Sequence, residues 1–255
     1  MRAADKPKIA VYDLTDCEGC EVELINLKEE LIDLSEEVDI VNWRLAADKA
    51  SSGPFDVTLI EGTPVTEHER EQLRDLRKKS AVLIALGACA CTGGIPAIID
   101  DERDRMDFYK MIYPPSYVPQ GTEAKPLDAY VKIDFYIHGC PVDKREIERI
   151  LSDLLACKKP ELRDEPVCMS CKINDNDCML AKDKPCLGPI IRGGCNSFCI
   201  THGKSCVGCY GMIKDANFDR MVERLGEIMD PGDAELLLGM FLSESKEFKK
   251  KYDRK

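Results

Sequence analysis

The chain has 255 residues, a third of them charged, and its formal net charge is −11. This length accommodates one large domain or two small ones with a substantial apolar core. The acidic balance argues against nucleic acid as a partner, because nucleic-acid binding needs a basic surface. No apolar run approaches the roughly 18 residues of a membrane-spanning helix, so we expect no transmembrane segment. Residues 1–8 contain neither a signal-peptide core nor a twin-arginine pair, which predicts a cytoplasmic protein.

Strand-like and helix-like segments alternate through the first 160 residues. Apolar, partly β-branched runs predict strands at residues 9–15, 38–43, 56–60, 81–86 and 131–137. The spacing of apolar residues predicts helices at residues 22–34 and 143–157, and a capping box of Thr66 and Glu69 opens another at 67–79. This alternation predicts an α/β domain, which we expect to be a flavodoxin-like parallel sheet with helices on both faces.

Four cysteines follow different predicted strands. Cys17 and Cys20 come after the first strand, Cys89 after the fourth and Cys140 after the fifth. Open parallel sheets bind ligands beyond the carboxyl ends of their strands, so these cysteines should converge on one edge of the sheet. Glu61 follows the third strand at the same edge. We therefore predict a four-thiolate metal site within a domain of residues 1–160.

The sequence changes character after residue 160. Residues 161–215 show little periodicity and many Gly and Pro, and we expect a small irregular domain held by metals rather than by an apolar core. Its eight cysteines are Cys168, Cys171, Cys178, Cys186, Cys195, Cys199, Cys206 and Cys209. Residues 216–255 are predicted to form a C-terminal helical extension, with helices at 216–229 and 233–243. Its basic tail, residues 246–255, is expected to be a frayed, solvated terminus.

Twelve of the 14 cysteines thus fall into three sets of four. Disulfides are disfavoured because thiols stay reduced in the cytoplasm. Iron–sulfur cubanes and structural zinc sites both take four cysteine thiolates. The spacing lacks the two separated CxxC pairs of a zinc ribbon and also the tight cysteine run of bacterial ferredoxins. The pattern favours iron–sulfur clusters but leaves zinc open.

The two remaining cysteines and the three histidines are weaker candidates. Cys91 is either an alternative ligand or a small buried side chain beside the first site, and Cys157 is expected to be a core residue at a helix end. His68 is expected at the surface. His138 could hydrogen-bond a cluster sulfide and His202 could tune a nearby centre, although an ordinary loop histidine with satisfied hydrogen bonds is the simpler interpretation of His138. We predict none of the histidines as a ligand.

The sequence indicates little catalytic apparatus. Glu61 could relay protons at the first site, or it could accept backbone N–H bonds from the loop around the cysteines. Glu18 and Glu21, on either side of Cys20, are weaker candidates of the same kind. The sequence contains no P-loop, no GxGxxG after the first strand, no GxSxG and no HExxH motif. These absences favour an electron conduit that serves a catalytic partner.

Several motifs together resemble the small subunits of nickel–iron hydrogenases. The motifs that resemble the proximal-cluster region are Cys17-x2-Cys20, Leu59-Ile60-Glu61-Gly62, Gly87-Ala88-Cys89-Ala90 with Gly93-Gly94, and Gly139-Cys140-Pro141. The motifs that resemble the cytoplasmic branch are Pro166-Val167-Cys168-x2-Cys171, Cys186-Leu187-Gly188-Pro189 and Gly194-Cys195. That branch includes the delta subunits of archaeal sulfhydrogenases and of NADP-linked hydrogenases. The resemblance extends to about residue 215.

The resemblance implies three 4Fe–4S clusters held by twelve cysteines. The implied proximal ligands are Cys17, Cys20, Cys89 and Cys140. The implied distal ligands are Cys168, Cys171, Cys178 and Cys186. The implied medial ligands are Cys195, Cys199, Cys206 and Cys209.

Four features depart from the membrane-linked members of that family. Cys199 stands where many of them have a proline and a 3Fe–4S medial centre, which implies a full cubane here. Cys168 stands where they use a histidine at the distal cluster. They begin with a twin-arginine signal, which residues 1–8 lack. Cys91 adds a second cysteine near Cys89.

The implied function is non-catalytic electron transfer in a soluble, anaerobic hydrogenase. Hydrogen would react at a nickel–iron centre in a separate large subunit, which the loops of Cys17 and Cys89 should face. Electrons would leave to a flavin, deazaflavin or heterodisulfide-reductase type of subunit. Two alternatives remain, a single-cluster subunit of a quinone-linked respiratory complex and a zinc-stabilised scaffold. The separation of Cys17 from Cys20 and the eight-cysteine segment argue against the first alternative.

Overall fold

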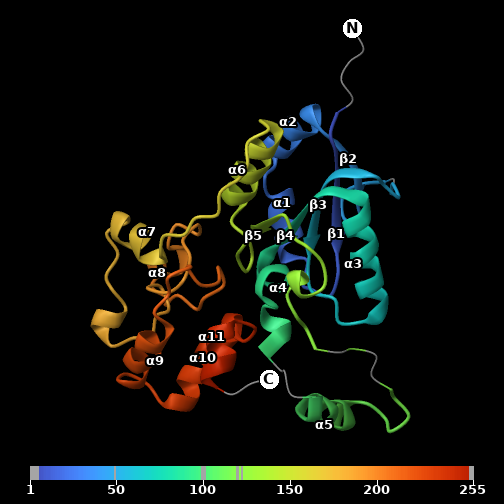
Figure 1. Ribbon diagram of the computed structural model, residues 1–255. Helices are drawn as coiled ribbons and strands as arrows, with labels where there is room; N and C mark the ends of the chain where they lie inside the picture. Colours follow the sequence, from blue (N-terminus) through green and yellow to red (C-terminus); the bar gives the residue numbers. More distant parts are fainter. Residues whose placement is uncertain (1–5, 49, 99–101, 119–120, 122, 253–255) are drawn as a thin grey trace.

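A five-stranded parallel sheet forms the centre of the N-terminal part of the molecule (Figure 1). The computed structural model describes residues 6–48, 50–98, 102–118, 121 and 123–252, and for residues 102–105 the backbone alone. The strands are β1 (Lys8–Asp13), β2 (Asp39–Trp43), β3 (Phe55–Glu61), β4 (Ser80–Leu86) and β5 (Phe135–Ile137). Their order across the sheet is β2-β1-β3-β4-β5, the flavodoxin-like order. The predicted fold class is confirmed.

Eleven α-helices are described. They are α1 (Gly19–Ile25), α2 (Glu29–Glu37), α3 (Glu67–Lys79), α4 (Gly87–Thr92), α5 (Glu102–Ile112), α6 (Lys144–Leu155), α7 (Val167–Ile173), α8 (Phe198–Thr201), α9 (Phe218–Gly226), α10 (Pro231–Leu242) and α11 (Lys246–Lys251). Three 3₁₀ turns are η1 (Ile95–Ile98), η2 (Leu127–Ala129) and η3 (Leu180–Lys182). The predicted capping box of Thr66 and Glu69 is present at the start of α3.

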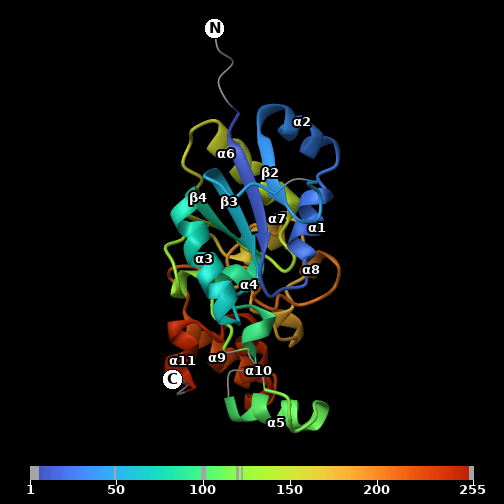
Figure 2. The same cartoon turned by 90° about the vertical axis from the view of Figure 1, so that its right-hand side faces the viewer.

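Helices cover both faces of the sheet because alternate strand residues are apolar on each face. Leu24 of α1 and Ile147 of α6 pack on one face, with Leu59 of β3 in the same cluster. Leu73 of α3 packs on the other face against Ile60 of β3. In both views α9, α10 and α11 lie beyond the carboxyl ends of the strands, while α2 lies at the opposite end (Figures 1 and 2).

A third apolar cluster lies in residues 167–248, contrary to the expectation that metals alone would hold this segment. Leu187 and Ile191, from irregular loops, are buried together with Leu225 of α9 and Leu238 of α10. Single apolar residues scattered in loops leave no periodic signal, so the sequence pattern could not reveal this core.

Two predicted elements have different bounds in the structure. The helix expected at 22–34 is broken into α1 and α2, because Leu27 turns inward and Lys28 adopts φ 54°. The strand expected at 131–137 shortens to β5. The carboxylate of Asp134 accepts the Leu83 N–H at 2.9 Å. This side chain therefore takes the place of the backbone carbonyl that would accept the same N–H in a longer strand.

The C-terminal tail was wrongly expected to fray. Residues 246–251 form α11, and Phe248 is fully buried against Gly239 of α10. Residues 253–255 lie outside the described residues. Cys157 was also wrongly expected in the core: it is exposed, with φ 55°, just after the end of α6. The helix α5 lies in a stretch for which no regular structure was predicted.

Candidate metal centres

The first four cysteines lie on loops that leave one edge of the sheet. Asp13 pairs with Glu61 and Glu61 with Leu86, so β1, β3 and β4 end at the same level. The chain turns from these ends directly into α1, which contains Cys20, and α4, which contains Cys89. This register explains why the cysteines that follow these strands meet at one edge of the sheet, as their places after parallel strands predicted.

Glycine lets two of these loops approach closely. The Ala88 N–H donates to the Gly139 carbonyl at 2.7 Å, which joins α4 to the loop of Cys140. Gly87 has φ 84°, and a Cβ atom there would collide with the Cys20 sulfur. A glycine is thus required at Gly87 both by its backbone conformation and by the thiol beside it.

Glu61 is 2% exposed and both of its carboxylate oxygens accept backbone hydrogen bonds. The N–H groups of Cys20 and Glu21 donate to it at 3.0 and 2.7 Å. Burial raises the pKa of Glu61, and these two donors act in the opposite direction. The contacts are those of the structural alternative, in which Glu61 fixes the turn around the cysteines.

The two flanking glutamates differ in environment. Glu18 pairs with Arg44 at the surface. Glu21 is fully buried, accepts a hydrogen bond from Trp43 Nε1 at 2.8 Å, and has one oxygen without a partner in the described structure. Burial raises the pKa of Glu21 to about 7, while the Trp43 bond opposes that rise.

The thiols of the first group lie close enough to influence one another. Burial, with smaller contributions from Cys140 and Cys17, raises the pKa of Cys89 to about 12. Burial is also the main cause of the raised pKa of Cys20, whose sulfur accepts a hydrogen bond from the Val142 N–H. Thiols in such a setting ionise when a bound metal compensates the charge.

The eight later cysteines form two further groups. In one of them, burial raises the pKa of Cys168 to about 11, with smaller contributions from Cys186, Cys171 and Cys178. Cys168 and Cys171 share one side of α7. A Cβ atom at Gly188 would lie 3.5 Å from the sulfurs of both Cys168 and Cys186, so this glycine leaves room between two thiols.

The other group lines a cavity. The pKa of Cys209 is raised to about 12, mainly by burial. The Cys140 N–H opposes this rise, whereas Cys195 and Cys199 contribute to it. A cavity of about 630 Å³ is lined by these thiols and that of Cys206. Backbone N–H groups also donate to the Cys195 sulfur. Space among four thiols, with N–H donors aimed at sulfur, fits an iron–sulfur cluster.

The three groups lie in series, in an order different from the sequence. The Cys140 N–H donates to the Cys209 sulfur, which links the edge of the sheet to the cavity. The Cys206 N–H donates to the Cys186 sulfur at 3.5 Å, which links the cavity to the group around α7. The last four cysteines of the sequence therefore lie between the other two groups.

Among the described residues, no three His, Cys, Asp or Glu side chains are arranged to hold a single metal ion. Of the two interpretations of Cys91, the structure agrees with the small buried side chain. Its sulfur donates to the Ala85 carbonyl at 3.5 Å. His68 is exposed, as expected. His202 packs against Phe198, whose carbonyl lies 2.8 Å from Nδ1.

His138 differs from the expected loop histidine. Its Nδ1 is buried without a hydrogen-bond partner in the described structure, and its ring stacks on Tyr136. Burial, with a smaller contribution from Arg192, lowers the pKa of His138 to about 3.

The sequence reasoning missed Tyr210, which directly follows Cys209 and lines the cavity. An aromatic residue beside a ligand candidate was a usable signal. It also missed the backbone N–H donors, which leave no trace in side-chain patterns.

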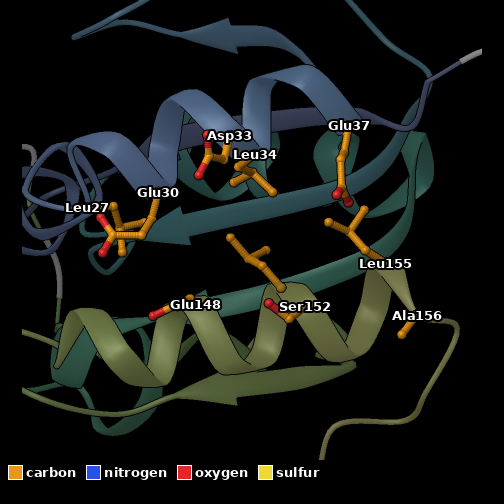
Figure 3. A pocket seen from close by; sticks show the side chains of 10 residues that line it. Leu27, Glu30, Asp33, Leu34, Glu37, Glu148, Ser152, Leu155 and Ala156 are labelled. Atoms are coloured by element: carbon orange, nitrogen blue, oxygen red, sulfur yellow. The ribbon is translucent and has the colours of Figure 1, made fainter.

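A separate groove of about 460 Å³ lies between α2 and α6 (Figure 3). Leu27, Leu34, Leu151 and Leu155 form its apolar lining, and none of its lining residues is a cysteine. Its remaining lining residues are Glu30, Asp33, Glu37, Glu148, Ser152 and Ala156. The groove belongs to none of the three cysteine groups.

Comparisons with known proteins agree with this architecture. Residues 17–154 match the family model described as NADH ubiquinone oxidoreductase, 20 Kd subunit. Sulfhydrogenase 2 subunit delta of Pyrococcus furiosus is 40% identical over 224 residues, which cover 87% of this chain and 93% of that relative. The chain belongs to the hydrogenase small-subunit family.

Other relatives match parts of this hydrogenase small subunit. The NAD-reducing hydrogenase HoxS subunit delta of Cupriavidus necator is 30% identical over 165 residues, 59% of this chain and 79% of that relative. A chain in the crystal structure of an NAD+-reducing [NiFe]-hydrogenase superposes with a TM-score of 0.56 at 30% identity, covering 61% of this chain and 94% of that one.

The fold also extends to more distant structures. The Ni-Fe-Se hydrogenase from Desulfomicrobium baculatum has a chain that superposes with a TM-score of 0.57 at 18% identity, covering 85% of this small subunit and 98% of that chain. No helix within the described parts of the small subunit combines the length and apolar character needed to cross a membrane.

Proposed function

We propose that this small subunit is the non-catalytic electron-transfer subunit of a soluble nickel–iron hydrogenase. It would connect the nickel–iron site of a large subunit with a redox partner subunit through three 4Fe–4S clusters. The observation that carries the proposal is the serial contact of three four-thiol groups through the Cys140 and Cys206 N–H groups.

The proposed ligands are the twelve cysteines of these groups. The proximal set is Cys17, Cys20, Cys89 and Cys140. The medial set is Cys195, Cys199, Cys206 and Cys209. The distal set is Cys168, Cys171, Cys178 and Cys186.

When bound, each cluster would supply one-electron oxidation and reduction. The chain's own groups would orient the thiolates and exclude water from them. Glu61 would hold the Cys20 turn through two backbone N–H groups, which favours a positioning role over a proton relay. The Val142 and Cys140 N–H groups would stabilise negative charge on the sulfurs of Cys20 and Cys209.

The partner surface is proposed to lie around the exposed proximal thiols. Cys17 and Cys140 are exposed, unlike Cys20. Val22 and Ile25, on the outer face of α1, are exposed apolar residues close to them in the chain. A large subunit that covers this surface would bury both the thiols and the apolar residues, as obligate interfaces do.

Three further features belong to the same proposal. The redox partner would be a flavin, deazaflavin or heterodisulfide-reductase type of subunit, and the assembly would act anaerobically in the cytoplasm. Residues 1–160 would carry the proximal cluster, 161–215 the other two, and 216–255 a helical extension.

Iron and acid-labile sulfide analysis of the anaerobically purified native complex tests the proposal, combined with EPR of the dithionite-reduced sample. We expect about twelve iron and about twelve sulfide per small subunit after subtraction of the partners' share. Zinc in place of this iron would establish the scaffold instead. About four iron would support the single-cluster alternative.

A further inference from the structure

The cavity between the cysteine groups contains a buried hydroxyl whose proton has no acceptor. Tyr210 is 4% exposed, and its O–H donates to no group within the described structure. Burying a hydroxyl whose proton has no acceptor is unfavourable, so native proteins rarely leave one in this state. The group that satisfies Tyr210 is therefore expected to occupy the cavity.

The position of the Tyr210 ring is tightly defined. A Cβ atom at Gly194 would lie 2.7 Å from ring atom Cε1, so the ring packs directly on the backbone of Gly194. Gly194 has φ 134° and precedes Cys195, while Tyr210 follows Cys209. The ring is thus held between two loops that each carry a thiol of the cavity.

The polar groups around the hydroxyl leave its proton free to donate. The Cys195 and Cys209 thiols and Asp143 act electrostatically on Tyr210, and the Asp143 N–H approaches it as a donor. A phenol has a single O–H to donate. A backbone N–H cannot accept that proton. The Asp143 carboxylate accepts hydrogen bonds from Arg145 and none from Tyr210. Sulfur is an acceptor that the cavity offers.

We propose that Tyr210 is a positioning residue whose hydroxyl donates a hydrogen bond to a sulfur atom of the cluster held by Cys195, Cys199, Cys206 and Cys209. This inference rests on the proposed function. A donor to sulfur stabilises the more negative, reduced state of a cluster, so it raises the reduction potential. Tyr210 would thereby make the middle centre of the series a better electron acceptor.

The test compares the wild-type complex with Tyr210→Phe, both purified anaerobically, by redox titration followed by EPR. At a fixed potential we expect the reduced-to-oxidised ratio of this one centre to fall about tenfold, equivalent to about 59 mV for a one-electron couple. Pulsed electron–nuclear spectroscopy in H2O and D2O should show one exchangeable proton fewer coupled to the reduced centre in Tyr210→Phe than in the wild type, because the backbone N–H donors to Cys195 and Cys209 remain in both. Tyr136→Phe is the matched control, because the Tyr136 hydroxyl pairs with Asp128 outside the cavity.

A second replacement separates donation from packing. Replacing Tyr210 with 3-fluorotyrosine keeps the ring and strengthens the phenol as a donor, so the ratio should shift in the direction opposite to that of Phe. An unchanged potential and proton coupling in both replacements, with full iron content, would overturn the inference. A wild-type complex without three clusters would instead overturn the proposed function.

Discussion

At the scale of single residues, the difference between a ligand and a bystander cysteine depends on its neighbours rather than on its burial. Cys91 is as buried as many of the proposed ligands, but its sulfur donates to backbone carbonyls of Ala85 and Ile137. Cys199 has other thiols around it instead. This contrast places Cys91 in the core and is the reason that Cys199, and not Cys91, is among the proposed ligands.

Cys199→Pro removes one of the four thiols of the proposed medial set. We expect the complex to lose about one iron per small subunit and to gain a paramagnetic signal in the oxidised state, since a 3Fe–4S centre would replace a cubane. Iron analysis and EPR provide the measurement. Cys157→Ser, at an exposed cysteine outside the three groups, should leave both unchanged.

An unchanged iron content in Cys199→Pro would show that Cys199 is not a ligand. Equal losses in Cys199→Pro and Cys157→Ser would instead indicate general instability of the loaded protein.

At the scale of elements, one ion pair compensates for the shortness of β5. Asp134 accepts hydrogen bonds from Arg77 of α3 at 2.5 Å and from the Leu83 N–H of β4 at 2.9 Å. It joins a helix and a central strand to the segment that enters β5. The Asp134 side chain thus links α3, β4 and the segment before β5, where β4 and β5 share only a short stretch of backbone pairing.

Asp134→Asn should destabilise the protein in a pH-dependent way. Burial alone would raise the pKa of Asp134, but the Arg77 and Leu83 donors outweigh it and hold the pKa below its ordinary value. Its contribution is therefore complete above the unfolded pKa of about 3.9 and is lost as the pH falls through the folded pKa. We expect a loss of about 2 kcal/mol near neutral pH, shrinking below about pH 4.

Thermal unfolding of the complex across this pH range checks the prediction. Asp107→Asn is the control, since Asp107 pairs with Lys110 on the exposed face of α5. A loss that stayed constant with pH would contradict an electrostatic origin.

The packing of α11 on α10 allows a second prediction at this scale. Phe248 is fully buried, and its ring contacts the backbone at Gly239. Phe248→Ala should lower the free energy of unfolding by about 3–5 kcal/mol, since a cavity replaces the ring. Leu236→Ala, at a residue 66% exposed on α10, should cost less than about 1 kcal/mol. Similar effects of the two changes in chemical denaturation would contradict this account of the C-terminal core.

The parts of the fold that the sequence predicted depend on local sequence patterns, whereas the parts that it did not predict depend on tertiary contacts. Continuous apolar runs predicted the parallel sheet and a capping signal predicted α3, because both leave a local pattern in the sequence. The rule that ligands bind beyond the carboxyl ends of parallel strands then predicted that Cys17, Cys89 and Cys140 share one edge. The break at Lys28 and the burial of Phe248 depend on tertiary contacts. Such contacts override local pattern and leave no periodic trace.

At the scale of the whole molecule, the exposed apolar residues of α1 and those of α2 lie at opposite ends of the sheet. Val22 and Ile25 belong to α1, the helix that directly follows the exposed Cys17, while Ile32 belongs to α2, which lies at the end of the sheet opposite to the strands' carboxyl ends (Figure 1). Only the first pair should be covered if the large subunit docks where electrons enter.

Val22→Arg should weaken association with the large subunit, because a charge would be buried in an apolar interface. We expect at least about tenfold weaker binding, equivalent to about 1.4 kcal/mol, measured by copurification and titration of the two subunits. Ile32→Arg serves as the control and should bind normally. Equal weakening by both changes would contradict an interface localised around the proximal thiols.

The backbone N–H of Cys140 has a consequence for how the series responds to charge. It donates to the Cys209 sulfur while the side chain of the same residue belongs to the neighbouring group. A change of charge at either centre therefore alters the bond that the other depends on. If both groups hold the proposed clusters, thermodynamic linkage gives the two effects the same free energy, so each electron that arrived at one centre would raise the cost of reducing its neighbour by a reciprocal amount. The two centres should consequently titrate over a wider range of potential than independent centres, and this negative cooperativity would favour passage of electrons one at a time.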